Sequence, residues 1–171
     1  FWQAHQGAVL RADAWSGYLV THGRDHSLRV WKMPDELGSV ALSSSMAKNL
    51  PLPTMLHEMG VNALNYCAYD MCIRNEDTPT LDGWLVIPNT LESGWIDLYH
   101  VPSQQRIIES LGRQADIRSG TERPATVMAL QICILRDILW IVAGYEDGAL
   151  QAWTIRVSTM EPTLAWTHKC H

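Results

Sequence analysis

Three residues near the start of the chain have the types that nucleophilic catalysis uses. Thr21 carries a hydroxyl, His5 an imidazole and Asp25 a carboxylate, which together resemble part of a Ser-His-Asp triad. Such a triad performs acyl transfer only where the hydroxyl is exposed on a strand end or a sharp turn beside an oxyanion hole. Thr21 instead lies two residues before Gly23 on an apolar strand, where we expect its side chain to face the interior. The sequence therefore predicts a structural role for these residues and no enzyme activity.

The histidines and cysteines lack the spacing of a metal site. His22 and His26 are four residues apart, but a turn between them does not bring two ring nitrogens together as a helix does. Cys67 and Cys72 have no second pair at zinc-site spacing, and we interpret the segment HKCH at 168–171 as the start of a further repeat. The phosphate-binding loop, the dinucleotide glycine fingerprint and the G-x-S-x-G elbow are also missing from the sequence. We expect no metal and no cofactor.

The composition is that of a folded protein with an acidic surface. Of 171 residues, 47% are apolar, and the net charge of −5 argues against a basic surface that tracks nucleic-acid phosphates. The four cysteines, without a secretory signal or a glycosylation sequon, favour a reducing compartment. Residues 125–144 could be mistaken for a membrane span, but Arg136 and Asp137 near the middle favour two buried strands joined by a turn. Because the chain begins with Phe1, we expect it to be a fragment.

One sequence pattern occurs three times along the chain. A polar residue stands four places before a valine in HQGAV (5–9), HEMGV (57–61) and RPATV (123–127). Each is followed, after a polar or glycine turn, by a run that ends in an aromatic residue: SLRVW, WIDLY and ALQAW. Short apolar runs alternate with turn residues throughout, and no stretch sustains a helical period. The expected fold is all-β, with one repeated unit per pattern.

Each unit is expected to contain three strands, with a fourth between units. The predicted strands are 8–13, 17–22 and 27–32, then 61–67, 83–88 and 95–100, then 126–133, 138–144 and 149–154. The fourth strands are predicted near 53–57, 105–110 and 162–167. We interpret residues 1–171 as one segment, with units at about 1–32, 53–100 and 105–154, and 162–171 as the outer strand of the next unit.

The first unit matches the WD-repeat blade of a β-propeller. In that family a histidine before the first strand, a hydroxyl on the second, a turn aspartate and a tryptophan on the third form one hydrogen-bonded network. The matching residues are His5, Thr21, Asp25 and Trp31. The physics agrees, because a buried indole N–H needs an acceptor, and a threonine hydroxyl can pass the hydrogen bond on to an imidazole.

The other units match the blade pattern less well. The third keeps Asp147 and Trp153 but has Ala143 at the hydroxyl position and Arg123 at the histidine position. The second keeps His57 and has neither the aspartate nor the tryptophan. The resemblance implies about three four-stranded blades, which form part of a larger propeller because propellers need at least four.

Three longer strings resemble one family within the WD-repeat proteins. They are AHQGAVLRADAWSGYLVTHGRDHSLRVWKMP, LHEMGVNALNYCAYDM and SGWIDLYHVPSQQRI. The fungal ASTRA-associated protein 1 family carries a similar H-G-R-D-N-S-L-R-V-W blade, a similar V-N-x-x-N-[FY]-C stretch and a similar G-x-[IV]-D-[IL]-Y-x-[LV]-P strand. In this chain His26 replaces the asparagine of the first pattern. The likeness covers nearly the whole chain, and a WD repeat alone does not demand the second and third strings.

The resemblance implies a non-enzymatic scaffold subunit of the ASTRA complex. Its expected partners are the TTT cochaperone subunits, the RuvB-like ATPases and the Tra-type pseudokinase. The expected role is in the maturation of phosphatidylinositol-3-kinase-related kinases and in chromatin remodelling. The expected compartment is the nucleus, with a cytoplasmic pool as an addition, and neither nucleic acid nor a membrane is an expected direct partner.

The surface of such a scaffold is expected to bind partners through its turns. The candidate residues are Arg24, His26, Tyr145 and Glu146. A propeller enzyme would instead need polar residues that converge on the central channel, and the inner strands AVLRAD, VNALNY and VMALQI supply few. The alternative function is a reader of histone or phosphopeptide motifs, with a central pocket to which Arg11 and Asp13 could contribute.

Overall fold

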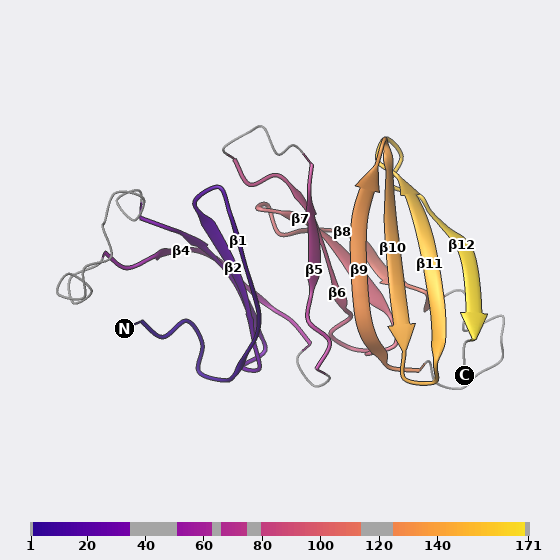
Figure 1. Cartoon of the computed structure of the whole chain (residues 1–171), viewed down its shortest axis with the longest axis horizontal. Helices are drawn as coiled ribbons and strands as arrows, with labels where there is room; N and C mark the ends of the chain where they lie inside the picture. The colour runs from indigo at the N-terminus through magenta and orange to yellow at the C-terminus, as the bar shows by residue number, and fades with distance from the viewer. Residues whose placement is uncertain (1, 35–50, 63–65, 75–79, 114–124, 170–171) are drawn as a thin grey trace.

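The computed structural model describes residues 2–34, 51–62, 66–74, 80–113 and 125–169. Within these ranges twelve β-strands form three four-stranded antiparallel sheets, so the prediction of an all-β fold with three units is confirmed. The sheets stand side by side in chain order, from the indigo first sheet through the magenta second to the orange and yellow third (Figure 1).

The strands of the first sheet lie side by side in chain order. It comprises β1 (Val9–Trp15), β2 (Tyr18–Gly23), β3 (Ser27–Lys32) and β4 (Thr54–Gly60). Ser16 and Gly17 join β1 to β2, both with positive φ (42° and 80°). A two-residue turn with this left-handed backbone matches the twist of the strands that it joins.

The second sheet contains the one strand that the sequence pattern misplaces. It comprises β5 (Asp70–Ile73), β6 (Gly83–Pro88), β7 (Ile96–Val101) and β8 (Gln105–Leu111). Of the strand predicted at 61–67, residues 61–62 and 66–67 are not in a strand and residues 63–65 lie outside the described ranges; the first strand of this sheet begins at Asp70. Val61 N donates to His26 O (3.0 Å) and Asn62 Nδ2 donates to Asn89 O (2.9 Å), so these residues bridge two turns before the strand begins.

The third sheet includes the long apolar stretch of the sequence. It comprises β9 (Val127–Leu135), β10 (Ile138–Tyr145), β11 (Ala149–Arg156) and β12 (Pro162–Lys169). The expectation of two strands joined at Arg136 and Asp137 is confirmed, and Arg136 adopts the left-handed backbone of a tight turn (φ 57°). In the described part of the chain, no helix has the length and apolar character needed to cross a membrane.

The fourth strand of each sheet corrects the unit boundaries expected from the sequence. β4 pairs with β3, β8 with β7 and β12 with β11, so each closes the sheet that precedes it in the chain. Units at 53–100 and 105–154 would therefore straddle two sheets, and residues 162–169 belong to the third sheet rather than to a following one. Antiparallel strands pair with their neighbours in the chain because their connections let them fold back directly.

Two apolar cores hold the three sheets face to face. Every residue of β6 is buried, because alternate side chains enter different cores. Leu85 and Ile87 face the first sheet, whereas Trp84 and Val86 face the third. The core between the first and second sheets includes Val20, Leu28, Val30, Tyr69, Tyr99 and Val101, and the other includes Ile96, Leu98, Leu139, Ile141, Trp153 and Ile155.

Candidate functional site

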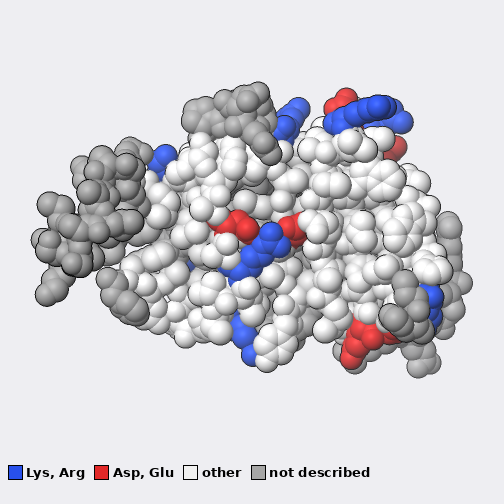
Figure 2. All heavy atoms as spheres, in the orientation of Figure 1, with Lys and Arg blue, Asp and Glu red and all other residues white. Residues whose placement is uncertain are grey.

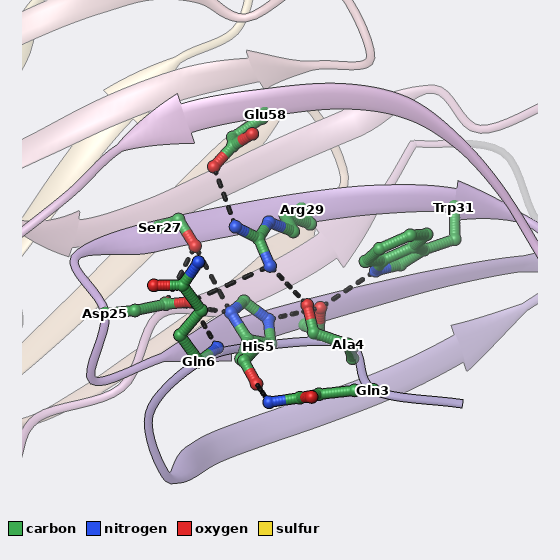
Figure 3. A network of polar contacts seen from close by, with 10 residues as sticks. Gln3, Ala4, His5, Gln6, Asp25, Ser27, Arg29, Trp31 and Glu58 are labelled. Atoms are coloured by element: carbon green, nitrogen blue, oxygen red, sulfur yellow. Dashed lines mark hydrogen bonds and ion pairs between the residues drawn. The ribbon is translucent and has the colours of Figure 1, made fainter. Parts of the chain in front are cut away.

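Four of the residues singled out in the sequence meet in one buried hydrogen-bonded network on the first sheet. His5 Nε2 lies 2.7 Å from Thr21 Oγ1, and His5 Nδ1 lies 2.9 Å from Asp25 Oδ1. Trp31 Nε1 donates to Thr21 Oγ1 at 2.9 Å. The segment before β1 carries His5 to Thr21 on β2, and Figure 3 shows His5 between Asp25 and Trp31.

The Asp25 carboxylate sets the direction of this chain of bonds. Asp25 Oδ1 can only accept, so His5 Nδ1 carries a proton and donates to it. In the neutral imidazole Nε2 then accepts from the Thr21 hydroxyl, which itself accepts from the indole N–H of Trp31. His5 and Thr21 are 4% and 2% exposed, so no substrate carbonyl reaches the hydroxyl. The arrangement holds a sheet together and is closed to nucleophilic chemistry.

The Asp25 carboxylate is the best supported acceptor of the network. Gln6 N donates to Oδ2 (2.9 Å) and Ser27 Oγ donates to Oδ1 (2.8 Å). Burial raises the pKa of this carboxyl, but the hydrogen bonds from Gln6, His5 and Ser27 outweigh burial and hold the pKa well below its usual range. Arg29 extends the cluster by donating to Glu58 Oε1 (3.0 Å).

The structure does not join the third-sheet residues into an equivalent network. Trp153 is buried in the core between the second and third sheets. Asp147 is exposed in the turn after β10, where its carboxylate accepts from Ala149 N (3.0 Å) and lies 3.3 Å from Lys169 Nζ. Ala143, at the hydroxyl position, offers no polar atom to connect the two.

The residues expected to bind partners lie in two turns. Arg24, His26 and Glu146 are exposed, whereas Tyr145, the last residue of β10, is half-buried. His26 has a left-handed backbone (φ 59°), which the β2–β3 turn requires.

Backbone contacts place these turns at one end of the molecule. Val61 N donates to His26 O (3.0 Å) and Val127 N donates to Ser93 O (2.9 Å), while Val127 pairs with Tyr145 across β9 and β10. We call this end the turn face and define it as residues 24–26, 61–62, 66–69, 89–95 and 146–148.

A second buried polar network, which the sequence analysis missed, supports the turn between β6 and β7. Asn89 Nδ2 donates to Asp97 Oδ1 (2.9 Å), which also accepts from Ser110 N (2.9 Å). The second oxygen of Asp97 has only Arg106 Nε nearby, at 3.9 Å. Asn89 and Asp97 are each 1% exposed. The signals were an asparagine directly after the apolar run GWLVIP and an aspartate inside the strand WIDLY.

A third polar cluster joins β1, β5 and β9, one strand from each sheet. Arg11 on β1 donates to Asp13 Oδ2 (2.6 Å) and pairs with Asp70 Oδ1 on β5 (2.8 Å). The other Asp70 oxygen accepts from Gln131 Nε2 (3.0 Å) and Ile132 N (2.7 Å) on β9. Figure 2 shows a compact charged group at the middle of this face, where these strands lie in Figure 1.

His22 is fully buried between the first and second sheets. Neither ring nitrogen has a hydrogen-bond partner, and the ring centroid lies 6.2 Å from that of Tyr69. Burial, followed by the nearby His5, lowers the pKa of His22 from 6.5 to about 4. No group of three or more His, Cys, Asp or Glu residues able to hold a metal occurs in the described ranges.

Comparison with solved structures concerns the fold alone. The chain is similar to the computationally designed Ika4 protein, with a TM-score of 0.52 and 14% identity over 99% of this chain and 77% of that one. It is equally similar to a chain of the mitotic checkpoint complex, with a TM-score of 0.52 and 15% identity over 98% of this chain and 42% of that one. No protein-family model matches the sequence.

Comparison with curated proteins gives the family. ASTRA-associated protein 1 of Verticillium alfalfae is 35% identical over 88% of this chain and 37% of its own length. The proteins of the same name from Penicillium rubens and Aspergillus niger are 34% and 30% identical over 91% and 98% of this chain. The chain spans 37 to 43% of the length of these three relatives. This similarity over almost all of its residues shows that the chain belongs to the ASTRA-associated protein 1 family.

Proposed function

We propose that this chain forms three blades of a WD-repeat β-propeller that serves as a non-enzymatic scaffold of the ASTRA complex. The whole protein works with the TTT cochaperone, the RuvB-like ATPases and the Tra-type pseudokinase. Its role is the maturation of phosphatidylinositol-3-kinase-related kinases and chromatin remodelling in the nucleus. Further blades close the ring, because three sheets cannot.

The closed network around His5 is the observation that carries this proposal. Its hydroxyl, imidazole and carboxylate have the types of a catalytic triad, yet they are bonded to one another, and the hydroxyl and the imidazole are buried. Their positions on the second strand, before the first strand and in the following turn are those of a WD-repeat blade. The proteins named ASTRA-associated protein 1 supply the complex in which such a scaffold works.

The nuclear assignment has support from a relative with another name. The histone transcription regulator slm9 of Schizosaccharomyces pombe is 29% identical over 80% of this chain and 19% of its own length. A role beside chromatin is consistent with that name.

The polar cluster of Arg11, Asp13 and Asp70 favours a scaffold over a reader of histone or phosphopeptide motifs. A reader would present Arg11 and Asp13 to its peptide. Instead Arg11 pairs with Asp13 and Asp70, and its Nη1 donates to Tyr69 O (3.2 Å). Charges that neutralise one another leave little for a peptide to recognise.

Affinity purification of the full-length protein tests the proposal. The tagged protein is expressed in a fungal host, isolated from nuclear extract and analysed by quantitative mass spectrometry. We expect the TTT subunits and the RuvB-like ATPases among the proteins recovered at near-stoichiometric amounts. Recovery of histones or of enzymes of one metabolic pathway, without these subunits, would contradict the scaffold function.

A further inference from the structure

We infer that Leu91 and Arg24 form the centre of a docking surface on the turn face. Its partner is a protein whose own surface has an apolar pocket for Leu91, bordered by carboxylates. This inference rests on the proposed scaffold function, because it identifies the surface and the chemistry by which the scaffold holds one of its partners.

Leu91 is the most exposed large apolar side chain in the described part of the chain. It is 90% exposed at the tip of the β6–β7 turn. A single exposed leucine on a flexible loop would not indicate a binding site, since many surface residues are apolar. The significance of Leu91 therefore depends on how firmly the turn is held.

The turn is held by buried polar groups. Asn89 Oδ1 accepts from both Leu91 N (2.9 Å) and Glu92 N (3.0 Å), and Trp95 N donates to Glu92 O (3.0 Å). The amide of Asn89 is in turn fixed by Asp97 beneath it. Burying a carboxylate costs free energy that a simple hairpin turn does not require. The molecule thus holds the leucine rigidly in solvent, and a rigid apolar protrusion loses little entropy on binding.

Two stacked arginines flank this turn. The Arg24 guanidinium lies 4.5 Å from the centroid of the Tyr66 ring, and its Nη1 donates to the Tyr66 hydroxyl (2.9 Å). Arg113 lies 5.2 Å from the ring centroid of Trp95, the residue that closes the Leu91 turn. Tyr66 is 68% exposed. Arginines fixed on aromatic rings keep donors for a partner and lose little freedom when they bind.

Contacts between the sheets join the two parts of this surface. Asn62 Nδ2 donates to Asn89 O, which connects the segment leading to Tyr66 with the Leu91 turn. Val61 N donates to His26 O, which connects the same segment with the Arg24 turn. Leucine, tyrosine and arginine therefore lie on neighbouring turns of one face. The complementary partner surface has an apolar pocket for Leu91 and carboxylates for the guanidinium groups.

Matched substitutions at the two ends of the molecule test the surface. Leu135 (63% exposed) and Arg136 lie at the β9–β10 turn, at the opposite end from the turn face, and provide controls of the same residue types. Full-length protein carrying Leu91→Asp, Arg24→Glu, Leu135→Asp or Arg136→Glu is purified from a fungal host. The TTT subunits and RuvB-like ATPases that accompany each variant are quantified, and a thermal melt confirms that each variant folds.

We expect Leu91→Asp to lower recovery of at least one of these subunits by about tenfold or more, and Arg24→Glu by severalfold. Leu135→Asp and Arg136→Glu should leave recovery unchanged. Equal recovery with Leu91→Asp and with the unsubstituted protein would overturn the docking surface while the proposed function stands. If the unsubstituted protein recovers none of these subunits, both the proposed function and this surface are overturned.

Discussion

At the scale of single residues, the first sheet depends on groups that satisfy one another in a fixed order. Trp31 donates to Thr21, Thr21 to His5 and His5 to Asp25. Because His5, Thr21 and Trp31 are buried, removal of one member leaves buried neighbours unsatisfied at roughly 1–3 kcal/mol each. Substitutions in this network should therefore cost more stability than substitutions of hydrogen-bonded residues on the surface.

Replacing Thr21 with valine tests this dependence, because valine has nearly the same shape without the hydroxyl. We expect Thr21→Val to lower the free energy of unfolding by about 2–4 kcal/mol, since the indole N–H and His5 Nε2 both lose their partner. Thr21→Ser keeps the hydroxyl and should cost less. Urea unfolding of the full-length protein measures both, and equal losses would contradict the network's role.

Gly23 is the second residue on which the network depends. A Cβ at this position would overlap His5 Nδ1 and the Asp25 carboxylate, whereas a Cβ at Gly60 meets nothing within 4 Å. We expect Gly23→Ala to destabilise the protein by about 1–3 kcal/mol and Gly60→Ala to have little effect. The two melting temperatures, compared with that of the unsubstituted protein, check this expectation. A neutral Gly23→Ala would mean that His5 can shift without loss.

His22 makes stability depend on pH. The pKa of His22 is lowered to about 4 in the folded protein. As the pH falls from 6.5 towards 4, His22 therefore binds a proton in the unfolded state but stays neutral in the folded state. Stability contributed by the neutral ring is present above pH 6.5 and is lost across this window, by about 3 kcal/mol at most. The groups around His22 include Tyr69 on the second sheet and Arg11, which lies opposite His22 in the pairing of β1 with β2.

Unfolding measured between pH 4 and 7.5 checks this window, with His22→Leu as the variant that cannot titrate. We expect the variant to lose less stability over this range than the unsubstituted protein. The low pKa of Asp25 acts in a different window, because stability from a depressed carboxyl is lost only below its ordinary value of 3.8. Parallel pH profiles for the two proteins would rule out His22 as the cause.

At the scale of elements, the three sheets are joined by two cores and by the Asp70 cluster. The Asp70 carboxylate pairs with Arg11 of the first sheet and accepts hydrogen bonds from Gln131 Nε2 and Ile132 N of the third, so it joins β1, β5 and β9. Apolar cores resist separation of the sheets but allow them to slide. Directional hydrogen bonds at one point fix the register between the sheets.

Substitution of Asp70 should therefore loosen the junction selectively. We expect Asp70→Ala to accelerate amide hydrogen exchange at Ile132 and along the middle of β9, because the amide loses its acceptor. It should also cost about 2–4 kcal/mol of stability, since the Arg11 and Gln131 donors lose a partner. Asp13→Ala is the control, because Asp13 pairs with the same arginine but does not reach β9. Similar exchange in both variants would contradict the role of Asp70.

Most elements could be predicted from the sequence, and the exceptions have physical causes. Continuous apolar runs predict both β6, whose alternate side chains enter the two cores, and β10, whose residues Leu139, Ile141 and Ala143 enter one core. The strand predicted at 61–67 fails because Val61 and Asn62 hydrogen-bond to neighbouring turns, contacts that a local pattern does not encode. The Asp70 junction was missed for the same reason, since its partners lie about 60 positions away in the sequence.

In the candidate site, too, the sequence predicts the residues that follow a family spacing and not those that depend on packing. His5, Thr21, Asp25 and Trp31 follow a spacing that a repeat family prescribes, so the sequence brings them together. Asp147 and Trp153 fit the same spacing, but without a hydroxyl at position 143 no hydrogen bonds connect them in the structure. Exposure of Leu91 and burial of Asp97 depend on the packing of whole turns, which residue types alone do not specify.

At the scale of the whole molecule, rigid sheets present their turns on one face while their polar groups are used internally. In the described part of the chain, the His5 network and the Arg11–Asp70 cluster are bonded internally, and so is Asp97 Oδ1 of the Asn89 network, whereas Asp97 Oδ2 has no hydrogen-bond partner. Turns that stand together on one face are available to partners, which agrees with the proposed scaffold within the ASTRA complex.

Direct binding between purified proteins tests the central claim. Full-length protein is mixed with purified TTT complex, with and without the RuvB-like ATPases, and the masses of the species formed are measured by mass photometry. The account predicts a stoichiometric assembly that contains this protein and dissociates with Leu91→Asp. If the proteins remain separate at micromolar concentration, with and without the ATPases, the scaffold function is contradicted.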